Sequence, residues 1–363
     1  MVALQVAPAP VVRALPHAPR LLLLGTGVVG RAVVARYQRL CERNLPLPRL
    51  ALLANSRGAQ ECGHDPAASL RLAERLPRDG AHVLAMDAFA AGDVVIDATA
   101  SDVVAARHAE WLARGLHVAT ANKLGSGSGL ARARAIGDAC ARSGARYGDS
   151  ATVGAGLPLL RSLRALVHGG DRIHGVEGVL SGSLAWLFDR YDGMRPFSGF
   201  VREARDAGYT EPDPRIDLSG EDVRRKLLIL ARAAGLPLEA EQVQVDSLVP
   251  PALAMASVDR LDGQLPLLDA PVRERFQQAY RDGGRLRFVA RFDAPADGDC
   301  SARVGLCALP ASHPICGGSG TDNRVAITSC RYSDQPLVIQ GPGAGAEVTA
   351  AALLDDVLRI VHP

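Results

Sequence analysis

The first part of the chain alternates short apolar runs with stretches whose apolar residues recur at helical spacing. The apolar runs predict strands at 20–24, 50–54, 93–101, 116–120 and 145–148. Helices are predicted at 29–41, within 64–90 (a stretch that also holds a short apolar run), at 108–114 and at 130–143. Strands that alternate with helices build βαβ units, so this pattern predicts an α/β domain with a parallel sheet.

The alternation stops at 149–158, a glycine-rich segment that we interpret as a hinge into a second domain. Helices are predicted at 157–168 and 181–191, with a strand at 173–179. From 240 to 320, strands such as 286–292 and 302–308 are expected to interleave with two helices, at about 251–259 and 271–282. This mixture is typical of an α+β domain with an antiparallel sheet.

A charged loop and a helix follow each other in the segment 207–231. The two prolines within 209–214 exclude a helix there and predict a rigid loop. Ser219 is predicted to cap the next helix, from 221 to about 234, with Asp222 three residues further on as in a capping box.

The helix predicted at 221–234 has one apolar face, which we expect to be buried. Its apolar positions are Val223, Leu227, Leu228, Leu230 and Ala231. Asp222 and Lys226 are four residues apart, so their side chains point the same way beside that face. A solvated surface ion pair is the alternative interpretation of these two residues.

A second glycine-rich turn, at 337–347, precedes a helix predicted at 348–361 and suggests that the chain returns to its first domain. We therefore divide the chain into a loose tail, a first domain, a second domain and a returning segment. These parts are 1–19, 20–149, 150–336 and 337–363.

Composition narrows the class of protein. With 363 residues, 48% hydrophobic and 22% charged, the chain resembles an ordinary soluble globular protein. A net charge of +2, scattered basic residues and 4% aromatic residues argue against a nucleic-acid surface. No apolar run approaches the ~20 residues of a membrane span. The seven cysteines show no C-x-x-C spacing, so we expect free thiols and a cytoplasmic protein.

The first glycine-rich turn has the spacing G-x-G-x-x-G and lies between a predicted strand and a predicted helix. In a dinucleotide site, such glycines permit the tight turn, the close approach of the pyrophosphate and the packing of helix on strand. We therefore predict a Rossmann-type nucleotide-binding domain; a glycine turn without a nucleotide is the alternative. The predicted cofactor contacts along the turn are Gly25, Thr26, Gly27, Val28, Val29 and Gly30.

The end of the second predicted strand bears on the choice of cofactor. An NAD site usually has Asp or Glu there to bind the ribose 2′-hydroxyl, whereas this chain has Asn55-Ser56-Arg57. Ser56 and Arg57 suit a 2′-phosphate, because arginine binds phosphate as a charged fork. The sequence thus favours NADP, with NAD as the alternative cofactor and a solvated Arg57 as the alternative interpretation.

Polar residues also follow the next two strands, at the sheet edge where doubly wound proteins bind ligands. Thr99, Ala100 and Ser101 end one strand, and Lys123 follows the other. A lysine at this edge is placed to meet a cofactor or a substrate. A structural lysine in a salt bridge is the alternative.

From about residue 20 to its end, the chain resembles the homoserine dehydrogenases. The matching stretches occur in the family's order: LLLLGTGVVG, DVVIDATASD, VATANK, ATVGAGLP, GVLSGSLAWLF, AGYTEPDPRIDLSGEDVRRKLLILAR and GPGAGAEVTAAALLDDVL. The signature GYTEPDP-x-x-DL-x-G-x-D-x-x-x-K is highly specific. The chain resembles in particular the dehydrogenase portion of bifunctional aspartokinase–homoserine dehydrogenases, here expected without a kinase or a regulatory domain.

This resemblance implies a reversible reduction of L-aspartate 4-semialdehyde to L-homoserine with NAD(P)H, in threonine and methionine biosynthesis. It implies that Lys226 donates the proton to the developing alkoxide and that Lys123 lies between nicotinamide and substrate. Substrate-holding carboxylates are implied at Glu211, Asp217 and Asp222. The implied cofactor site also includes Thr99, Ala100, Ser101, Lys123 and Gly345. A homodimer formed through the sheet of the second domain is implied as well.

The family's ATVGAGLP loop binds a monovalent cation such as sodium through main-chain carbonyls. The matching positions here are Ser150, Val153, Ala155 and Leu157. Ser150 departs from the acidic residue common at its place, which makes the cation site less secure. Ile216 departs from a usual Asp, but the neighbouring Asp217 is kept.

Two other functions fit the same pattern. A related NADP-dependent oxidoreductase would act on another amino-acid aldehyde, since one contact can change specificity. A non-catalytic dinucleotide-binding regulator would keep the fold without the chemistry. Such a regulator would be free to lose the charged set, yet the chain retains Lys123, Glu211, Asp222 and Lys226.

Overall fold

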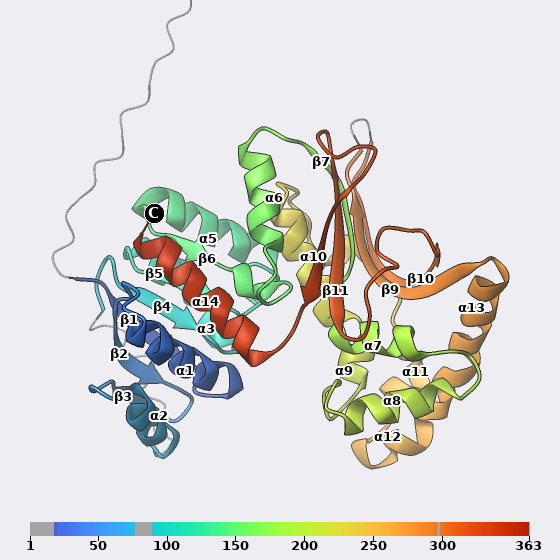
Figure 1. The fold of residues 1–363 in the computed structure, drawn as a ribbon, viewed down its shortest axis with the longest axis horizontal. Coiled ribbons are helices and arrows are strands. Elements are labelled where there is room, and N and C mark those ends of the chain that lie inside the picture. The colour runs from blue at the N-terminus through green and yellow to red at the C-terminus, as the bar shows by residue number, and fades with distance from the viewer. Residues whose placement is uncertain (1–17, 77–88, 296–297, 363) are drawn as a thin grey trace, which may run out of the picture.

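The computed structural model describes residues 18–76, 89–295 and 298–362. Two six-stranded sheets organise these residues, one in each half of the molecule (Figure 1). The predicted tail up to residue 17 and most of the apolar run before residue 89 lie outside the described residues.

The first sheet has the strand order β3-β2-β1-β4-β5-β6. Its five parallel strands are β1 (Arg20–Leu24), β2 (Arg49–Ala54), β4 (Val94–Asp97), β5 (His117–Thr120) and β6 (Tyr147–Gly148). The edge strand β3 (Ala59–Glu61), which the sequence pattern did not predict, pairs antiparallel with β2. The Rossmann-type α/β domain is thereby confirmed.

Helices cover both faces of this sheet, which is why its central strands β1 and β4 are apolar runs rather than alternating. Leu21 and Leu23 join the core under α1 (Val28–Glu42) and α14 (Ala346–Val361). Leu22 and Leu24 join the core on the other face. The helices on that face include α4 (His108–Ala113) and α5 (Leu130–Ser143). The short helices α2 (Pro66–Glu74) and α3 (Asp102–Ala106) complete the domain.

The second sheet has the order β12-β11-β7-β9-β10-β8 and is antiparallel except for the β8–β10 pair. Its strands are β7 (Ile173–Val179), β8 (Val243–Val245), β9 (Gly284–Asp293), β10 (Ser301–Pro310), β11 (Asp322–Ser329) and β12 (Leu337–Pro342). The predicted α+β domain with an antiparallel-rich sheet is confirmed.

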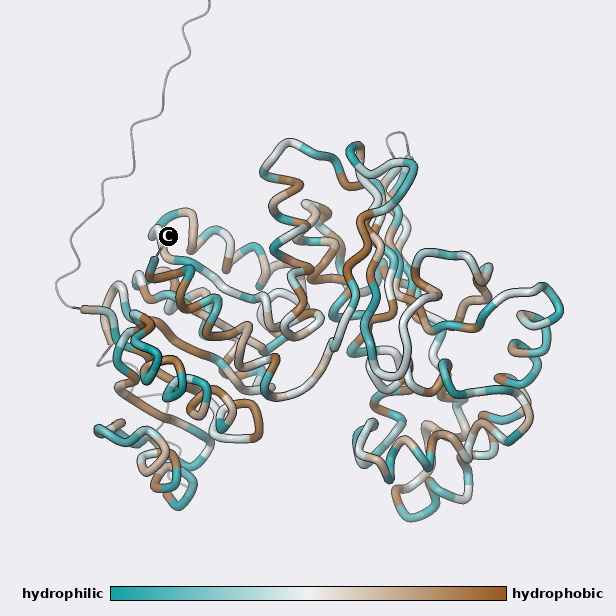
Figure 2. The backbone as a smooth tube through the Cα atoms, in the orientation of Figure 1, coloured by the Kyte–Doolittle hydropathy of each residue, from teal (hydrophilic) through white to brown (hydrophobic). Residues whose placement is uncertain are grey.

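One large hydrophobic core lies between this sheet and its helices. The helices are α6 (Leu159–His168), α7 (Gly182–Arg190), α8 (Phe197–Asp206), α9 (Arg215–Leu218), α10 (Glu221–Ala233), α11 (Pro251–Ala254), α12 (Val258–Gln264) and α13 (Asp269–Arg281). The tube in Figure 2 is hydrophobic along β1 and β4, whereas hydrophobic and hydrophilic residues alternate along outer helices such as α8. Across the described part of the chain, the helices are too short or too polar to traverse a bilayer.

Several helix predictions need correction. Ser219 does not cap α10; Gly220 does, with φ +78°, and Ser219 ends the short unpredicted helix α9. The two helices expected at 251–259 and 271–282 are three, α11, α12 and α13, joined in part by a 3-10 turn. Helix α8 was not predicted at all.

Candidate active site

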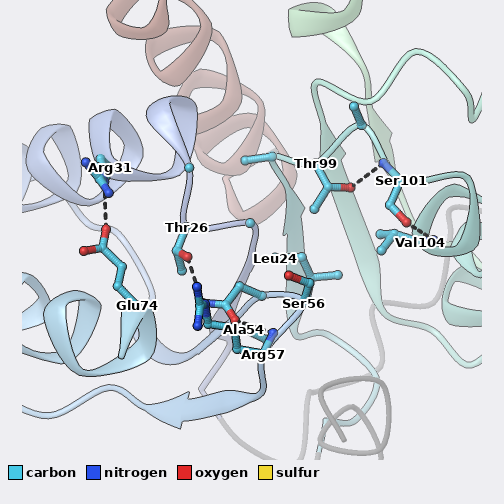
Figure 3. A pocket seen from close by; sticks show the side chains of 15 residues that line it. Leu24, Thr26, Arg31, Ala54, Ser56, Arg57, Glu74, Thr99, Ser101 and Val104 are labelled. Carbon is cyan, nitrogen blue, oxygen red and sulfur yellow. Dashed lines mark hydrogen bonds and ion pairs between the residues drawn. The ribbon is translucent and has the colours of Figure 1, made fainter. Parts of the chain in front are cut away.

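A cavity of about 540 Å³ opens at the carboxyl ends of β1, β2 and β4 (Figure 3). The predicted cofactor residues Gly25, Thr26 and Gly27 form one part of its wall. Ser56 and Arg57 form another, and the segment 99–101 a third. Val28 and Gly30 of the predicted set are not among the described residues that line it.

Close approaches require glycine at two of the three positions of the first turn. Gly25 has φ +97°, and a Cβ there would meet the carbonyl oxygen of Ala98 at 2.8 Å. A Cβ on Gly30 would overlap the carbonyl of Gly25. At Gly27 a Cβ would meet no described atom within 4 Å, so the backbone there faces open space. This arrangement fits the approach of a pyrophosphate to the turn.

Asn55, where an NAD enzyme usually has its acidic residue, is occupied in shaping the loop. Its side-chain NH₂ donates to the hydroxyl of Thr26 and to the carbonyl of Ala73, both at 2.9 Å. Its side-chain oxygen accepts from the backbone N–H groups of Arg57 (2.7 Å) and Gly58 (3.3 Å). Asn55 therefore holds the loop that presents Arg57 to the cavity.

A second cavity, of about 590 Å³, adjoins the first, because Ala98, Thr99 and Ala100 line both. Lys123, Asp222 and Lys226 all line this second cavity. Val29 and Gly345 of the predicted cofactor set also contribute to it. Residues from six separate segments of the described chain thus meet at the cleft between the two domains.

The three charged side chains form one cluster. The Nζ of Lys226 lies 2.9 Å from Oδ2 of Asp222, which confirms that the two side chains meet. The Nζ of Lys123 lies 3.4 Å from Oδ1 of the same carboxylate. Lys226 also donates to the carbonyl of Leu180 at 2.7 Å and is only 12% exposed. Two ammonium groups therefore share one carboxylate at the cavity wall.

Burial and charge act in opposite directions on these groups. Burial lowers the pKa of the Lys123 ammonium, and the charge of Asp222 opposes only part of that shift. Burial alone would raise the pKa of the Asp222 carboxyl, but the charges of Lys226 and Lys123 outweigh it and hold that pKa below its ordinary value. Asp222 therefore stays ionised, while Lys123 releases its proton more readily than a solvated lysine.

The other two predicted carboxylates do not line the described wall of this cavity. One oxygen of Asp217 accepts from the hydroxyl of Ser183 at 2.7 Å, and the other accepts from the backbone N–H of Glu211 at 2.9 Å. Asp217 thereby ties the two-proline loop to the start of α7. The side chain of Glu211 is exposed on that loop.

The predicted cation loop packs against α14. The N–H and the hydroxyl of Ser150 donate to the two oxygens of Asp356, at 2.9 and 2.8 Å. Asp356, which sequence reasoning missed, therefore supplies a carboxylate beside the position where the family often has an acidic residue. Ala155 has φ +48°, unusual for a residue other than glycine, and it lines the second cavity. Val153 is fully buried.

Sequence reasoning missed several residues that line the two cavities. Arg31 and Glu74 line the first, with Nε and Oε1 2.7 Å apart (Figure 3). Arg225 and Thr349 line the second. Two of these residues could have been found from their positions in the sequence. Arg31 directly follows the third glycine of the turn, and Arg225 directly precedes Lys226.

Comparison with known proteins gives the following matches. A family described as "Homoserine dehydrogenase" matches residues 158–358, and one described as "Homoserine dehydrogenase, NAD binding domain" matches residues 25–147. The bifunctional aspartokinase/homoserine dehydrogenase 1 of Zea mays is 43% identical over 280 residues, covering 77% of this chain and 30% of that protein. This chain thus spans less than a third of such bifunctional relatives.

Two further relatives match over their whole length. The homoserine dehydrogenase of Emericella nidulans is 34% identical over 365 residues, covering 94% of this chain and 97% of that protein. A solved structure of a protein of unknown function from Candida auris has a TM-score of 0.81 at 33% identity, covering 95% of this chain and 98% of that chain. Both domains of the fold are therefore shared.

Proposed function

Because the chain belongs to the homoserine dehydrogenase family, we propose that it catalyses the reversible reduction of L-aspartate 4-semialdehyde to L-homoserine with a nicotinamide cofactor. The observation that carries the proposal is the cluster of Lys123, Asp222 and Lys226 in a cavity that shares a wall with the dinucleotide cavity. The reaction belongs to threonine and methionine biosynthesis.

The charge balance of the second cavity supports reduction of a carbonyl. Lys123 and Lys226 outnumber the single carboxylate of Asp222, and Arg225 adds a further positive charge. When bound, the nicotinamide supplies the hydride, so negative charge grows on the aldehyde oxygen. An ammonium placed beforehand within reach stabilises that charge and can donate the proton.

Lys226 is the better held of the two lysines and is proposed as the proton donor. Its Nζ is fixed by the carbonyl of Leu180 and by Asp222, and its third N–H remains for the substrate oxygen. Lys123 is proposed to meet the substrate at the nicotinamide side, because it follows β5 beside Thr99 and Ala100. Glu211, Asp217 and Asp222 are proposed to hold the substrate, with Asp217 acting through the loop that carries Glu211.

The first test compares Lys226→Ala with Arg224→Gln. Arg224 lies on the same helix but is not among the described residues that line the cavity. Loss of the proton donor is expected to reduce kcat by about 10²- to 10⁴-fold while NADPH binding changes little. Arg224→Gln is expected to keep wild-type turnover. The measurement follows NADPH absorbance with aspartate semialdehyde, with cofactor binding measured by titration.

Unchanged turnover in Lys226→Ala would remove that assignment. If the wild-type protein binds NADPH but reduces neither this aldehyde nor related amino-acid aldehydes, the enzymatic proposal fails. A turnover preference for another aldehyde would place the protein among related oxidoreductases.

We further propose that the cofactor is NADP. Arg57 offers positive charge at the end of β2, whereas Arg31 across the cavity is paired with Glu74, and the side-chain oxygen of Asn55 already accepts two N–H groups. A charge-assisted hydrogen bond contributes about 1.5–3 kcal/mol, which is roughly 10- to 100-fold in affinity.

Arg57→Ala is therefore expected to raise KM for NADPH by about 10- to 100-fold and KM for NADH by less than about threefold. Arg71→Gln, which removes an equal charge from an exposed position on α2, is the control. An equal loss with both cofactors, or no loss with NADPH, would contradict the assignment of the 2′-phosphate to Arg57.

Two further features are proposed from the same family membership. The loop at Ser150, Val153, Ala155 and Leu157 is proposed to bind a monovalent cation through its carbonyls. A cytoplasmic homodimer formed through the second sheet is also proposed. Its mass in solution by light scattering would be twice 38.1 kDa, and a stable monomer would refute it.

A further inference from the structure

A chain of buried polar groups lies next to the turn that carries Lys123, and none of its members lines either cavity within the described residues. Asp97, at the end of β4, and His108, at the start of α4, are both fully buried. Nε2 of His108 lies 3.0 Å from Oδ2 of Asp97, and Nδ1 lies 3.1 Å from the hydroxyl of Tyr147 on β6. The chain thus joins three elements of the first domain, β4, α4 and β6.

The hydrogen bonds around Asp97 hold its carboxyl group in one orientation. Thr99 donates to Oδ1 of Asp97 from its backbone N–H (2.9 Å) and from its hydroxyl (2.7 Å). In the tautomer that carries its proton on Nε2, His108 donates to the other oxygen of Asp97 and accepts from the hydroxyl of Tyr147 at Nδ1. Each partner is held in one orientation.

These buried polar groups pack directly against the turn that follows β5. A Cβ on Gly125 would overlap the hydroxyl of Tyr147 and would lie 3.1 Å from Nδ1 of His108. The backbone N–H of Gly127 closes the turn by donating to the carbonyl of Lys123 at 2.7 Å. Tyr147 and His108 therefore pack against one side of the turn that carries Lys123.

Helix α10 forms the opposite side of the same turn. A Cβ on Gly127 would meet the carbonyl of Arg225 at 3.1 Å and Cδ1 of Ile229 at 3.1 Å. Arg232, also on α10, donates to the carbonyls of Ser126 and Ser128, both at 2.6 Å. The turn is thus clamped between the buried chain and the helix that carries Asp222 and Lys226.

The buried chain also reaches the cavity wall shared by both sites. The hydroxyl of Thr99, which donates to Asp97, lies 3.4 Å from the side-chain nitrogen of Asn122. Asn122 in turn accepts from the backbone N–H of Leu124 at 3.1 Å. The ends of β4 and β5 are therefore fixed to each other through the carboxylate of Asp97.

We propose that Asp97, His108 and Tyr147 are positioning residues that set the Lys123 ammonium against Asp222 and Lys226. The expected effect on turnover rests on the proposed function. The expectation that these residues fix the turn at 123–127 does not. None of the three lines either cavity within the described residues. They act by fixing the backbone of the turn at 123–127, and a misplacement of a catalytic group by about 1 Å can cost about 10²-fold in rate.

The test compares Tyr147→Phe with Tyr37→Phe, two identical deletions of one hydroxyl in the same domain. The hydroxyl of Tyr37 is hydrogen-bonded as well: it donates to the carbonyl of Pro48 and accepts from the N–H of Leu50, both at 3.1 Å. Tyr37 lies on α1, in the core on the other side of the sheet from α4 and α5. It therefore controls for a loss of stability without a path to Lys123.

Tyr147→Phe is expected to lower kcat by about five- to twentyfold, with KM for NADPH within about twofold of the wild type. Tyr37→Phe is expected to leave kcat unchanged at a comparable loss of Tm. Hydrogen exchange gives a readout that needs no activity: amides at 122–127 should exchange faster in Tyr147→Phe and at wild-type rates in Tyr37→Phe.

Unchanged exchange at 122–127 in Tyr147→Phe overturns the proposal, as does an equal kcat in the two variants. If the wild-type protein does not reduce aspartate semialdehyde, the proposed function fails, and hydrogen exchange still decides whether these residues fix the turn. Failure of the one proposal is thus distinguishable from failure of the other.

A double-mutant cycle adds an independent check. Gly125→Ala should lower kcat strongly in the wild-type background, because its methyl group meets the Tyr147 hydroxyl. With Phe at position 147 that oxygen is absent, and the same substitution should cost several-fold less. Additive effects of the two changes would contradict the contact on which the proposal depends.

Discussion

Asp222 decides the charge state of the site, because its carboxylate contacts both lysines. It lies 2.9 Å from Nζ of Lys226 and 3.4 Å from Nζ of Lys123. Burial lowers the pKa of Lys123, and Asp222 is the nearby charge that opposes this shift. Without it, Lys123 would lose its proton at a still lower pH.

The pH dependence of Asp222→Asn tests this balance. Removing the carboxylate charge lowers the pKa of Lys123 further, so the protonated lysine disappears earlier as pH rises. The alkaline limb of kcat/KM for aldehyde reduction is therefore expected to move to lower pH. The control is Glu221→Gln, a neighbouring acid that pairs with Arg224 instead and should leave the limb in place. A limb that stays or moves to higher pH in Asp222→Asn would contradict the proposed coupling.

At the residue scale, local spacing predicted some contacts and long-range packing decided the others. The meeting of Asp222 and Lys226 follows from their separation on one helix. The third member, Lys123, is 99 positions before Asp222 in the chain, so nothing in local sequence could pair them. The same holds for Asp97, His108 and Tyr147, whose contacts depend on how three elements stack.

At the element scale, the buried face of α10 was predicted correctly, because a helix with apolar residues along one face is stable when that face packs against the core. Val223, Leu227, Leu228 and Leu230 are all at most 2% exposed. The start of the helix at Glu221 was also predicted correctly, but its cap was wrongly assigned to Ser219, which matched the preferred capping residues. Gly220 is the cap because the chain leaves α9 through a left-handed residue.

The two domains differ in how well their elements were predicted, and the cause is physical. The five parallel strands of the first sheet lie under helices and were found within a few residues, whereas the polar edge strand β3 was missed. The helices α8, α9, α11 and α12 are short pieces that pack around a core shared with the second sheet. Their boundaries depend on tertiary contacts more than on periodicity.

At the scale of the whole molecule, one segment joins the two domains and also lines the active site. The chain leaves β12, passes through Gly343, Ala344 and Gly345 at the second cavity, and enters α14 on the first domain (Figure 1). The return of the chain to the first domain was predicted from the second glycine-rich turn. The need for glycine at position 343 was not predicted, because it depends on Asn323 on β11, outside that segment.

Gly343 has no room for a side chain. A Cβ there would overlap the side chain of Asn323 on β11, with the Cβ of Asn323 at 2.7 Å. Asn323 is fully buried, and neither of its amide atoms has a hydrogen-bond partner among the described residues. The linker between the domains therefore packs against Asn323, and the buried amide of Asn323 contributes no hydrogen bond to stability within the described residues.

Gly343→Ala is expected to destabilise the protein by about 1–3 kcal/mol, because overpacking shifts the backbone. It should also raise KM for the substrate, since the displaced segment forms the cavity wall. Asn323→Gly removes the obstructing atoms, so the double variant should be more stable than the sum of the single changes by about 1 kcal/mol or more. Stability is measured by denaturant unfolding.

Gly137→Ala is the matched control for this cycle. Gly137 lies within α5, and a Cβ there would meet no described atom within 4 Å. The substitution should stabilise the protein by about 0.5–1 kcal/mol through helix propensity and leave KM unchanged. If Gly343→Ala behaved like this control, the linker would be free to move, and the wall that connects the two domains at the cavity would not be fixed by Asn323. Strict additivity with Asn323→Gly would lead to the same conclusion.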